Sequence, residues 1–411
     1  MARSLGLTAY RAWARRAEPP ADDGSWPARP AGQLIWIHAG ETSNFLAVQD
    51  LAKRLVASQN RLNVLMTTSA NGKPDATAAL PVRDTILAQA APSEHPVAVA
   101  RFLDHWQPDV CIWVWGGLRP NLILAASDRG IPLLLIDADA DGFDRSHGRW
   151  LPDLTRHVLS RFSTVIARSA AGQRRLTQMG VLPSKVQHLS PLLAGGQALP
   201  CIDSDLTDLS SAMGGRPTWF AAHLLPNEMP IVLTAHKQAL RLSHRLLLLV
   251  QPASPGAADG LAALATDQHL ACVRWDEGQY PDETTQVMIS GDPRDRGLFF
   301  RLAPVSFMGS TLIQGNDGCD PLDAAALGSA VLYGPKVRHF LPSYSRLATA
   351  GAARIVNDAD ALGIAVTSLI APDHAATMAH AGWDVISQGA ELADRVVDLV
   401  QDALDRDRSP A

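Results

Sequence analysis

Residues 34–39 read LIWIHA, residues 62–68 read LNVLMTT, and the fourteen residues 45–58 between them read FLAVQDLAKRLVAS. Each of the two short runs is almost wholly apolar, which is typical of a strand buried on both faces. The segment 45–58 carries its apolar side chains at helical spacing. Strand, helix and strand in this order form a parallel βαβ unit, so this stretch predicts a doubly wound α/β fold.

The same alternation continues along the chain. Apolar runs at residues 110–115, 131–136 and 164–168 alternate with helical segments, and the pattern restarts at residue 217 after a pause. Such alternation predicts parallel sheets with helices on both faces. We therefore expect two doubly wound Rossmann-like domains, whose ligands bind beyond the carboxyl ends of the strands.

Connecting segments of distinct composition set the expected domain boundaries. Residues 18–32 are rich in Pro, Gly and Asp, and residues 194–213 have the polar composition of a linker. The expected division is a basic N-terminal segment and linker at 1–32, a first domain at 33–195, a linker at 196–215, a second domain at 216–390 and a C-terminal helix at 391–411.

Composition narrows the class of protein. A net charge of −5 argues against a general nucleic-acid-binding protein, so no nucleic acid is expected as a partner. The four cysteines lack C-x-x-C spacing, which argues against a zinc ribbon, and scattered thiols fit a reducing cytoplasm. No apolar run reaches the roughly 18–20 residues that span a bilayer. The first strand is followed by no G-x-G-x-x-G, and the chain contains no P-loop motif.

The N-terminal residues 1–17 (MARSLGLTAYRAWARRA) mix arginines with Leu, Tyr and Trp and lack the features of a secretory signal. This composition suits a helix lying on an anionic membrane surface, and it equally suits a frayed basic terminus. Both interpretations stay open.

Five segments resemble, in order along the chain, the 3-deoxy-D-manno-octulosonic acid (Kdo) transferases. They are WIHAGETSNFLAVQDLAKRL from residue 36, RFLDHWQPDVCIWVWGGLRPNLILAASDRGIPLLLIDA from residue 101, RFSTVIARSAAGQRRLTQMGV from residue 161, GDPRDRGLFFRLAPVSFMGSTL from residue 291 and DPLDAAALGSAVLYGP from residue 320. The resemblance spans residues 33–370. It implies the GT-B fold, in which two Rossmann-like domains face each other across a cleft.

The resemblance also implies an activity. Kdo transferases are CMP-sugar-dependent inverting glycosyltransferases that attach Kdo from CMP-Kdo to a lipid A precursor in lipopolysaccharide biosynthesis. The expected partners are therefore a CMP-sugar donor, a lipid A-type glycolipid acceptor and the inner-membrane surface. The resemblance implies a cytoplasmic protein, peripheral on the inner face of the inner membrane. It implies no cofactor beyond the donor substrate and no catalytic metal.

The expected catalytic position departs from the family pattern. The family's first strand ends in a Ser-x-Gly-Glu turn, whose Glu is the general base on the acceptor hydroxyl. Asn44 falls at that position here, and a neutral amide cannot accept the proton. Glu41 lies three residues earlier in a Gly-Glu pair and is the candidate base. Its alternative interpretation is a carboxylate that stabilises the nearby helix N-terminus.

Two more segments of the first domain depart from the family. Residues 114–121 (VWGGLRPN) replace an acidic run, so Trp115 and Arg119 form either a binding wall or a packed indole with a solvated cation. Asp137, Asp139, Asp141 and Asp144 resemble a calcium-loop fragment, but Gly148 stands where an EF-hand needs its bidentate Glu. An EF-hand is therefore not expected, and a divalent-cation site here remains an alternative.

The resemblance places the donor nucleotide in the second domain. Glu228 matches a family Glu after the first strand of that domain, and His223 is either a shifted family His or a loop imidazole. The family's Pro-Arg-His-Pro segment corresponds to QPASP at 251–255, which lacks both cations that would meet the donor's anionic groups.

The strongest local match is the turn and helix start after residue 307. A Gly-rich turn that opens a helix favours a phosphate, and Asp323 corresponds to the Glu that binds the nucleotide ribose in the family. Asp320 can cap the helix, although its charge would repel a phosphate. The expected donor-binding residues are Glu228, Gly309, Ser310, Gly315, Asp320 and Asp323.

These departures leave two further functions open. One is a catalytically inactive paralogue that binds a glycolipid or a partner enzyme. The other is a transferase with an altered donor or acceptor.

Overall fold

The structure is a computed structural model, which describes residues 10–12, 14–16, 26–40, 44–68, 85–140, 152–196, 198–313 and 318–408. The chain divides into two compact units. Unit 1 comprises Met1–Ala194 together with Gly389–Ala411, and unit 2 comprises Gly195–Gln388.

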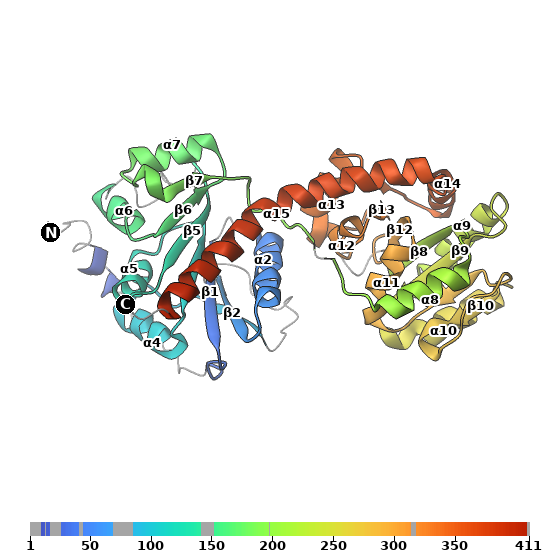
Figure 1. Cartoon of the computed structure of the whole chain (residues 1–411), viewed down its shortest axis with the longest axis horizontal. Coiled ribbons are helices and arrows are strands. Elements are labelled where there is room, and N and C mark those ends of the chain that lie inside the picture. The colour runs from blue at the N-terminus through green and yellow to red at the C-terminus, as the bar shows by residue number, and fades with distance from the viewer. Residues whose placement is uncertain are drawn as a thin grey trace. The chain divides into compact units, whose positions relative to one another are not determined.

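Unit 1 is built on a seven-stranded sheet of order β3-β2-β1-β4-β5-β6-β7, in which every neighbouring pair is parallel (Figure 1). The strands are β1 Gln33–Ala39, β2 Leu62–Thr68, β3 Ile86–Ala90, β4 Val110–Val114, β5 Leu133–Ala138, β6 Thr164–Ala167 and β7 Val186–His188. The order reverses between β1 and β4, which is the position where doubly wound sheets bind ligands.

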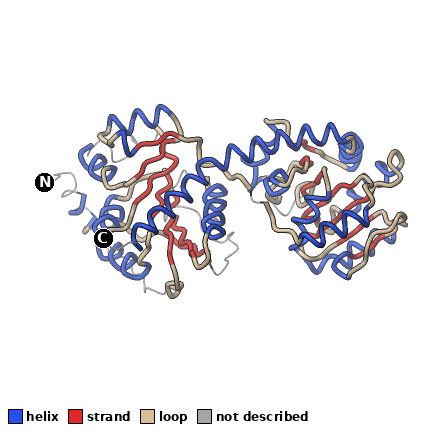
Figure 2. The backbone as a smooth tube through the Cα atoms, viewed as in Figure 1, coloured by secondary structure: helices blue, strands red, loops and turns tan. Residues whose placement is uncertain are grey.

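The helices of unit 1 connect successive parallel strands and cover the sheet (Figure 2). They are α2 Phe45–Ser58, α4 Pro96–Trp106, α5 Pro120–Asp128, α6 Pro152–Leu159, α7 Ala170–Gln178 and the 3-10 turn Pro183–Lys185. Large aromatic side chains fill the core between sheet and helices. Trp36 of β1 contacts Phe102 of α4 and Trp113 of β4, at ring-centroid distances of 5.3 Å and 6.0 Å. Burial of such rings is the main stabilising contribution in this unit.

Unit 2 repeats this architecture with an all-parallel sheet of order β10-β11-β9-β8-β12-β13-β14. Its strands are β8 Thr218–Leu224, β9 Leu247–Pro252, β10 Cys272–Arg274, β11 Val287–Ile289, β12 Val305–Met308, β13 Ala330–Tyr333 and β14 Ala353–Ile355. Here the order reverses between β8 and β12, so the equivalent ligand position lies at the carboxyl ends of these two strands.

Helices again surround the sheet of unit 2 (Figures 1 and 2). They are α8 Asp203–Met213, α9 Met229–Leu240, α10 Ala258–Asp267, α11 Arg296–Leu302, α12 Leu322–Ala326, α13 Leu341–Thr349, α14 Ala359–Leu369 and α15 Pro372–Arg408, with 3-10 turns at Pro255–Ala257, Trp275–Glu277, Pro293–Asp295 and Arg338–Phe340.

Helix α15 contributes to both units, because its residues from Gly389 onward belong to unit 1. There it lies beside α2, and Asp394 pairs with Arg54 at 3.3 Å (Figure 1). Glu391 accepts a hydrogen bond from the Ser190 hydroxyl at 2.6 Å. The last part of the chain is therefore fixed to the first unit by polar contacts.

The two doubly wound Rossmann-like units confirm the predicted α/β class. Two predicted segments differ. The linker expected at 196–215 contains α8, and the separate C-terminal helix expected at 391–411 is the end of α15, which runs unbroken through Gly389. Among the described residues, no helix is long and apolar enough to cross a membrane.

Candidate functional site

The candidate site of unit 2 lies where β8 and β12 run side by side, with Met308 opposite Ala222. The loops that follow these strands approach each other closely at Gly309. A Cβ atom on Gly309 would lie 2.6 Å from the carbonyl oxygen of His223 and 2.8 Å from that of Ala222. Only glycine fits this approach, which explains why the sequence has Gly directly after the strand.

Two residues with left-handed backbone conformation flank this contact. His223 has a φ of +53° and Ser310 a φ of +59°. The Ser310 hydroxyl donates to the carbonyl oxygen of His223 at 2.9 Å. The Nδ1 atom of His223 lies 3.0 Å from the same Ser310 hydroxyl oxygen. Burial and the positive charge of Arg296 lower the pKa of His223, so the ring is neutral at pH 7.

Glu228 holds the loop after β12 in place. Its side chain is fully buried, and its carboxylate accepts backbone N–H groups from both loops. The donors are Leu225 at 3.2 Å, Ser310 at 2.6 Å, Thr311 at 3.0 Å and Leu312 at 2.9 Å.

Glu228 therefore positions the loop, and it uses the N–H groups of residues 310–312 that a phosphate would need. The turn was expected to cradle a phosphate from residue 309 to 320, and the structure assigns its first N–H groups to Glu228 instead. Gly315, which was also expected here, lies outside the described residues.

A small cavity of about 50 Å³ opens beside this loop. It is lined by Ala222, His223, Arg296, Phe300, Met308, Cys319, Asp320 and Asp323. The structure thus brings Asp320 and Asp323 to one cavity, as the sequence predicted, and places Gly309, Ser310 and Glu228 in the loops behind it. Asp320 also accepts the N–H of Leu322 at 3.1 Å, which confirms its expected contact at the start of α12.

Arg296 is the residue that sequence reasoning missed in this cavity. It begins α11, and its Nε donates to the side-chain oxygen of Gln251 at 2.7 Å. Gln251 is 1% exposed, and its own NH₂ group donates to the carbonyl oxygen of Asp292 at 2.7 Å. The only available signal was an arginine before the GLFF segment, and nothing in that local sequence points to β8.

Cys319 lines the same cavity, but its thiol is unreactive. Burial raises the pKa of Cys319 to about 12, so almost none of it is thiolate at pH 7. The cavity therefore offers a ligand one positively charged side chain, two carboxylates and a neutral imidazole. Its thiol does not serve as a nucleophile.

In unit 1, the predicted catalytic position is a helix N-cap. Asn44 precedes α2, and its side-chain oxygen accepts the N–H of Ala47 at a long 3.5 Å. Glu41 lies outside the described residues. Gly40 ends the strand region at a close contact, where an added Cβ would lie 2.4 Å from the Cα of Gly116. The loops after β1 and β4 therefore meet without side chains between them.

His38 of β1 is part of the core. Its Nδ1 lies 2.9 Å from the Thr67 hydroxyl, and its ring contacts Trp113 at a centroid distance of 4.0 Å. Burial, together with a smaller effect of the charge of Arg119, lowers the pKa of His38 to about 3. The imidazole is therefore neutral and packs within the domain.

One interpretation of the sequence made Arg119 a solvated cation, and the structure shows that this is wrong. It lies 3.7 Å from Glu94, with both side chains mostly buried, and donates to the Pro92 carbonyl oxygen. Glu94 also accepts the N–H groups of Asn121 and Leu122 at the start of α5, at 2.9 Å and 3.3 Å. Trp115 is buried, as the packed-indole interpretation predicts. These residues fix the entry to α5.

The acidic segment after β5 is bonded within the protein where it is described. Asp137 accepts the N–H of Leu192 at 2.9 Å, and burial raises its pKa. Asp139 pairs with Arg168 at 2.8 Å. Asp141 and Asp144 lie outside the described residues. Across the described part of the chain, no three His, Cys, Asp or Glu side chains are grouped to hold a metal ion.

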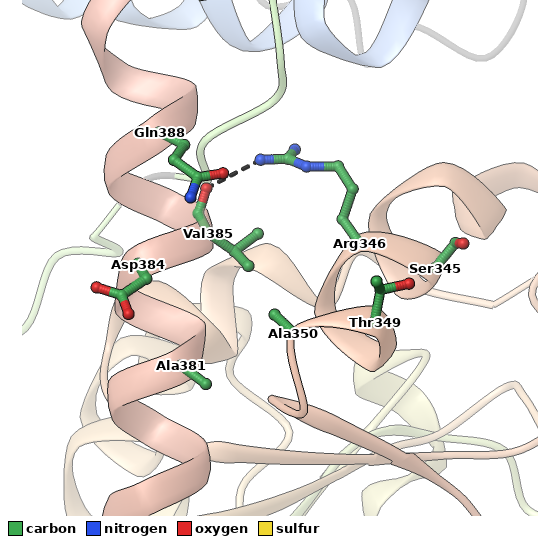
Figure 3. Close-up of a pocket in the computed structure, with 8 residues that line it drawn as sticks. All are labelled: Ser345, Arg346, Thr349, Ala350, Ala381, Asp384, Val385 and Gln388. Carbon is green, nitrogen blue, oxygen red and sulfur yellow. Dashed lines mark hydrogen bonds between the residues drawn. The ribbon is translucent and has the colours of Figure 1, made fainter.

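A larger open groove of about 460 Å³ lies in unit 2 between α13 and α15 (Figure 3). Arg346 of α13 crosses it and donates to the carbonyl oxygen of Val385 at 2.9 Å. None of the donor-binding residues expected from the sequence lines this groove. The smaller cavity, at the carboxyl ends of β8 and β12, is therefore the candidate site.

Known proteins similar to this chain share one description. The sequence profile of the family described as 3-deoxy-D-manno-octulosonic-acid transferase (kdotransferase) matches residues 11–192. A probable mitochondrial 3-deoxy-D-manno-octulosonic acid transferase of Arabidopsis thaliana is 27% identical over 345 residues, covering 82% of this chain and 76% of the relative. The 3-deoxy-D-manno-octulosonic acid transferase of Haemophilus influenzae is 25% identical over 384 residues, covering 92% and 88%.

Solved structures with some likeness to the chain are more distant. The C-terminal CMP-Kdo binding domain of WaaA from Acinetobacter baumannii has a TM-score of 0.42 and 20% identity, covering 44% of this chain and 96% of its own. MurG of Acinetobacter baumannii has a TM-score of 0.44 and 14% identity, covering 90% and 99%.

Proposed function

We propose that the chain is a member of the 3-deoxy-D-manno-octulosonic acid (Kdo) transferase family and that it transfers Kdo from CMP-Kdo to a lipid A precursor. The observation that carries this proposal is the extent of the similarity. The Haemophilus influenzae relative aligns with 92% of the chain, so the likeness includes both units. A match confined to one Rossmann-like unit would indicate only a shared fold.

The cavity in unit 2 supports a role in binding the donor. It lies at the position where doubly wound sheets bind nucleotides, beyond the ends of β8 and β12. Asp323 has a carboxylate that can accept hydrogen bonds from both ribose hydroxyls. In this proposal, Asp323 binds the nucleoside part of the donor, Asp320 holds the start of α12, and Glu228 keeps the loop behind them in shape.

The proposed reaction is an inverting transfer. A base removes the proton of the acceptor hydroxyl, the hydroxyl oxygen forms the new bond to the sugar, and CMP leaves with the electrons of the old bond. Glu41 is the proposed base, and Asn44 acts as the N-cap of α2 rather than as a proton acceptor. The lipid acceptor places the protein on the inner face of the inner membrane in this proposal.

The test is a transfer assay with purified full-length protein, radiolabelled CMP-Kdo and a lipid A precursor. We expect labelled lipid and free CMP in equal amounts, and loss of both in a Glu41→Gln variant that keeps its circular dichroism spectrum. Unchanged substrates beside an active control enzyme would overturn the proposal. Binding of CMP without turnover, measured by calorimetry, would indicate the inactive paralogue instead.

A further inference from the structure

The cavity of unit 2 is lined by a positively charged side chain, Arg296, which the sequence did not predict there. The segment 251–255 (QPASP) lacks the Arg and His that the resemblance led us to expect for the donor's anionic groups. Yet Gln251, the first residue of this segment, binds the guanidinium of Arg296, which reaches the cavity from a different element, α11. Among the described residues that line the cavity, Arg296 is the only lysine or arginine.

Arg296 is held in one orientation from behind. Its Nε–H is used by the side-chain oxygen of Gln251, at 2.7 Å. Gln251 cannot turn away easily, because it is almost completely buried and its NH₂ group is bonded to the Asp292 carbonyl oxygen. A buried amide fixed at both ends therefore sets the direction of the guanidinium plane.

The two terminal nitrogens of Arg296 have no hydrogen bond and no ion pair in the part of the chain that the structure describes. The residue is half-buried, so its charge is only partly hydrated. The positive charge acts on groups from two sides of the cavity, since it lowers the pKa of His223 and offsets part of the rise in the pKa of Cys319. Guanidinium groups bind planar or tetrahedral oxyanions through two parallel N–H bonds.

We propose that Arg296, oriented by Gln251, forms an anion-binding subsite that takes an oxyanion of the sugar-nucleotide donor. This inference rests on the proposed function for the identity of the donor. Two oxyanions of CMP-Kdo have the required chemistry, namely the phosphate of CMP and the carboxylate of the sugar acid. The enclosed space of about 50 Å³ suits one such group and not the whole donor.

The other charged groups of the cavity do not bind an oxyanion. Asp320 and Asp323 carry carboxylates, which accept hydrogen bonds and donate none to an anion. The backbone N–H groups of residues 310–312 already bond to Glu228. Arg296 therefore supplies the charge that neither the loop nor the segment 251–255 provides.

The test compares Arg296→Gln with Arg294→Gln in phosphate-free buffer. Arg294 is a matched control because it lies two residues away, is 89% exposed and pairs with Asp292. Calorimetry measures binding of CMP and of cytidine, and steady-state kinetics measure KM for CMP-Kdo. Loss of a charge-assisted bidentate contact is expected to weaken the affected binding about 10- to 100-fold.

If the phosphate occupies the subsite, Arg296→Gln weakens CMP binding by this factor and leaves cytidine binding unchanged. If the sugar carboxylate occupies it, CMP binding is unchanged and KM for CMP-Kdo rises instead. Arg296→Lys keeps the charge and loses the fork, so its defect should be intermediate. Arg294→Gln should match the wild type within about twofold.

A folded Arg296→Gln protein that matches the wild type in both CMP affinity and KM would overturn the subsite and leave the proposed function standing. A wild-type protein that binds neither CMP nor CMP-Kdo would overturn both. The two failures are therefore distinguishable in one set of measurements.

Discussion

Replacing Glu228 by Gln should loosen the loop after β12 without changing the size of the side chain. The two carboxylate oxygens divide four backbone N–H groups between them. One oxygen accepts from Thr311 and Leu312, and the other accepts from Leu225 and Ser310. Glutamine keeps one oxygen and puts an NH₂ group in place of the other, so two N–H groups face a donor whichever way the amide turns.

The size of the effect follows from this geometry. Each buried N–H group that loses its acceptor costs about 1–3 kcal/mol, so two cost about 2–6 kcal/mol. That is a large fraction of the roughly 5–15 kcal/mol that stabilises a typical domain. We therefore expect the loop to open locally, and we expect unit 2 to unfold at a lower denaturant concentration.

The assay is hydrogen exchange of the amides of residues 310–312, combined with urea unfolding. In Glu228→Gln these amides should exchange at least about 30-fold faster, and Glu277→Gln, on an exposed turn, should leave them unchanged. Wild-type protection of these amides in Glu228→Gln would refute the reasoning, because it would mean that the carboxylate does not hold the loop.

Three further outcomes follow from the site. The pKa of His38 is about 3 in the folded protein and near its ordinary value of 6.5 in the unfolded chain. Between these two pH values only the unfolded chain takes up a proton. The free energy of unfolding therefore falls as the pH drops through this window, by up to about 1.4 kcal/mol per pH unit. His38→Gln should flatten this slope in urea unfolding between pH 7 and 5, and an unchanged slope would contradict the assignment. Asn44→Ala should lower the stability of unit 1 by about 0.5–1 kcal/mol in urea unfolding, and Asn44→Asp should leave it unchanged, because Asp is an equally good N-cap. A large loss of kcat in both variants would contradict the capping role. Asp320→Asn keeps a side-chain acceptor for the Leu322 N–H and removes a negative charge that repels the phosphate of CMP. Calorimetry should therefore find CMP bound about two- to fivefold more tightly. Weaker binding would contradict the repulsion between Asp320 and the phosphate.

The sequence predicted most of the fold because the buried strands of parallel sheets carry continuous apolar runs. Strand β2 and helix α2 begin and end at the predicted residues. Strand β3 was not predicted, since its ILAQA sequence is short and its middle residues are only half-buried. Helix α8 falls within the predicted linker, because four of its first seven residues are Asp or Ser. Acidic residues in the first turn nevertheless stabilise a helix.

The predicted break before residue 391 was wrong for a physical reason. Gly389 stands where the break was predicted, and a glycine in the middle of a helix costs about 1 kcal/mol relative to Ala. Helix α15 nevertheless continues, and the residues after Gly389 make contacts that a local sequence pattern does not report. Asp394 and Glu391 pair with Arg54 and Ser190, which are hundreds of residues away in the sequence.

The candidate site could be predicted only where it follows from local pattern. Asp320, Asp323 and Gly309 lie on one turn and helix start, so their proximity is encoded within a few residues. The position of Arg296 depends on how α11 packs beside β8 and β9, and its contact with Gln251 joins residues 45 positions apart. A single sequence contains no periodicity or spacing that reports such a pair.

The role of Glu228 explains why the donor site should depend on side chains more than on its loop. A turn at the start of a helix usually binds a phosphate through free backbone N–H groups. Here one buried carboxylate uses those of residues 310–312, so their bonding energy stabilises the fold and is not available to a ligand. Recognition of an anion must then come from a side chain that reaches the same cavity, and Arg296 is the one that does. Because a side chain can change without altering the loop, substrate preference in such a site can shift while the backbone keeps its shape.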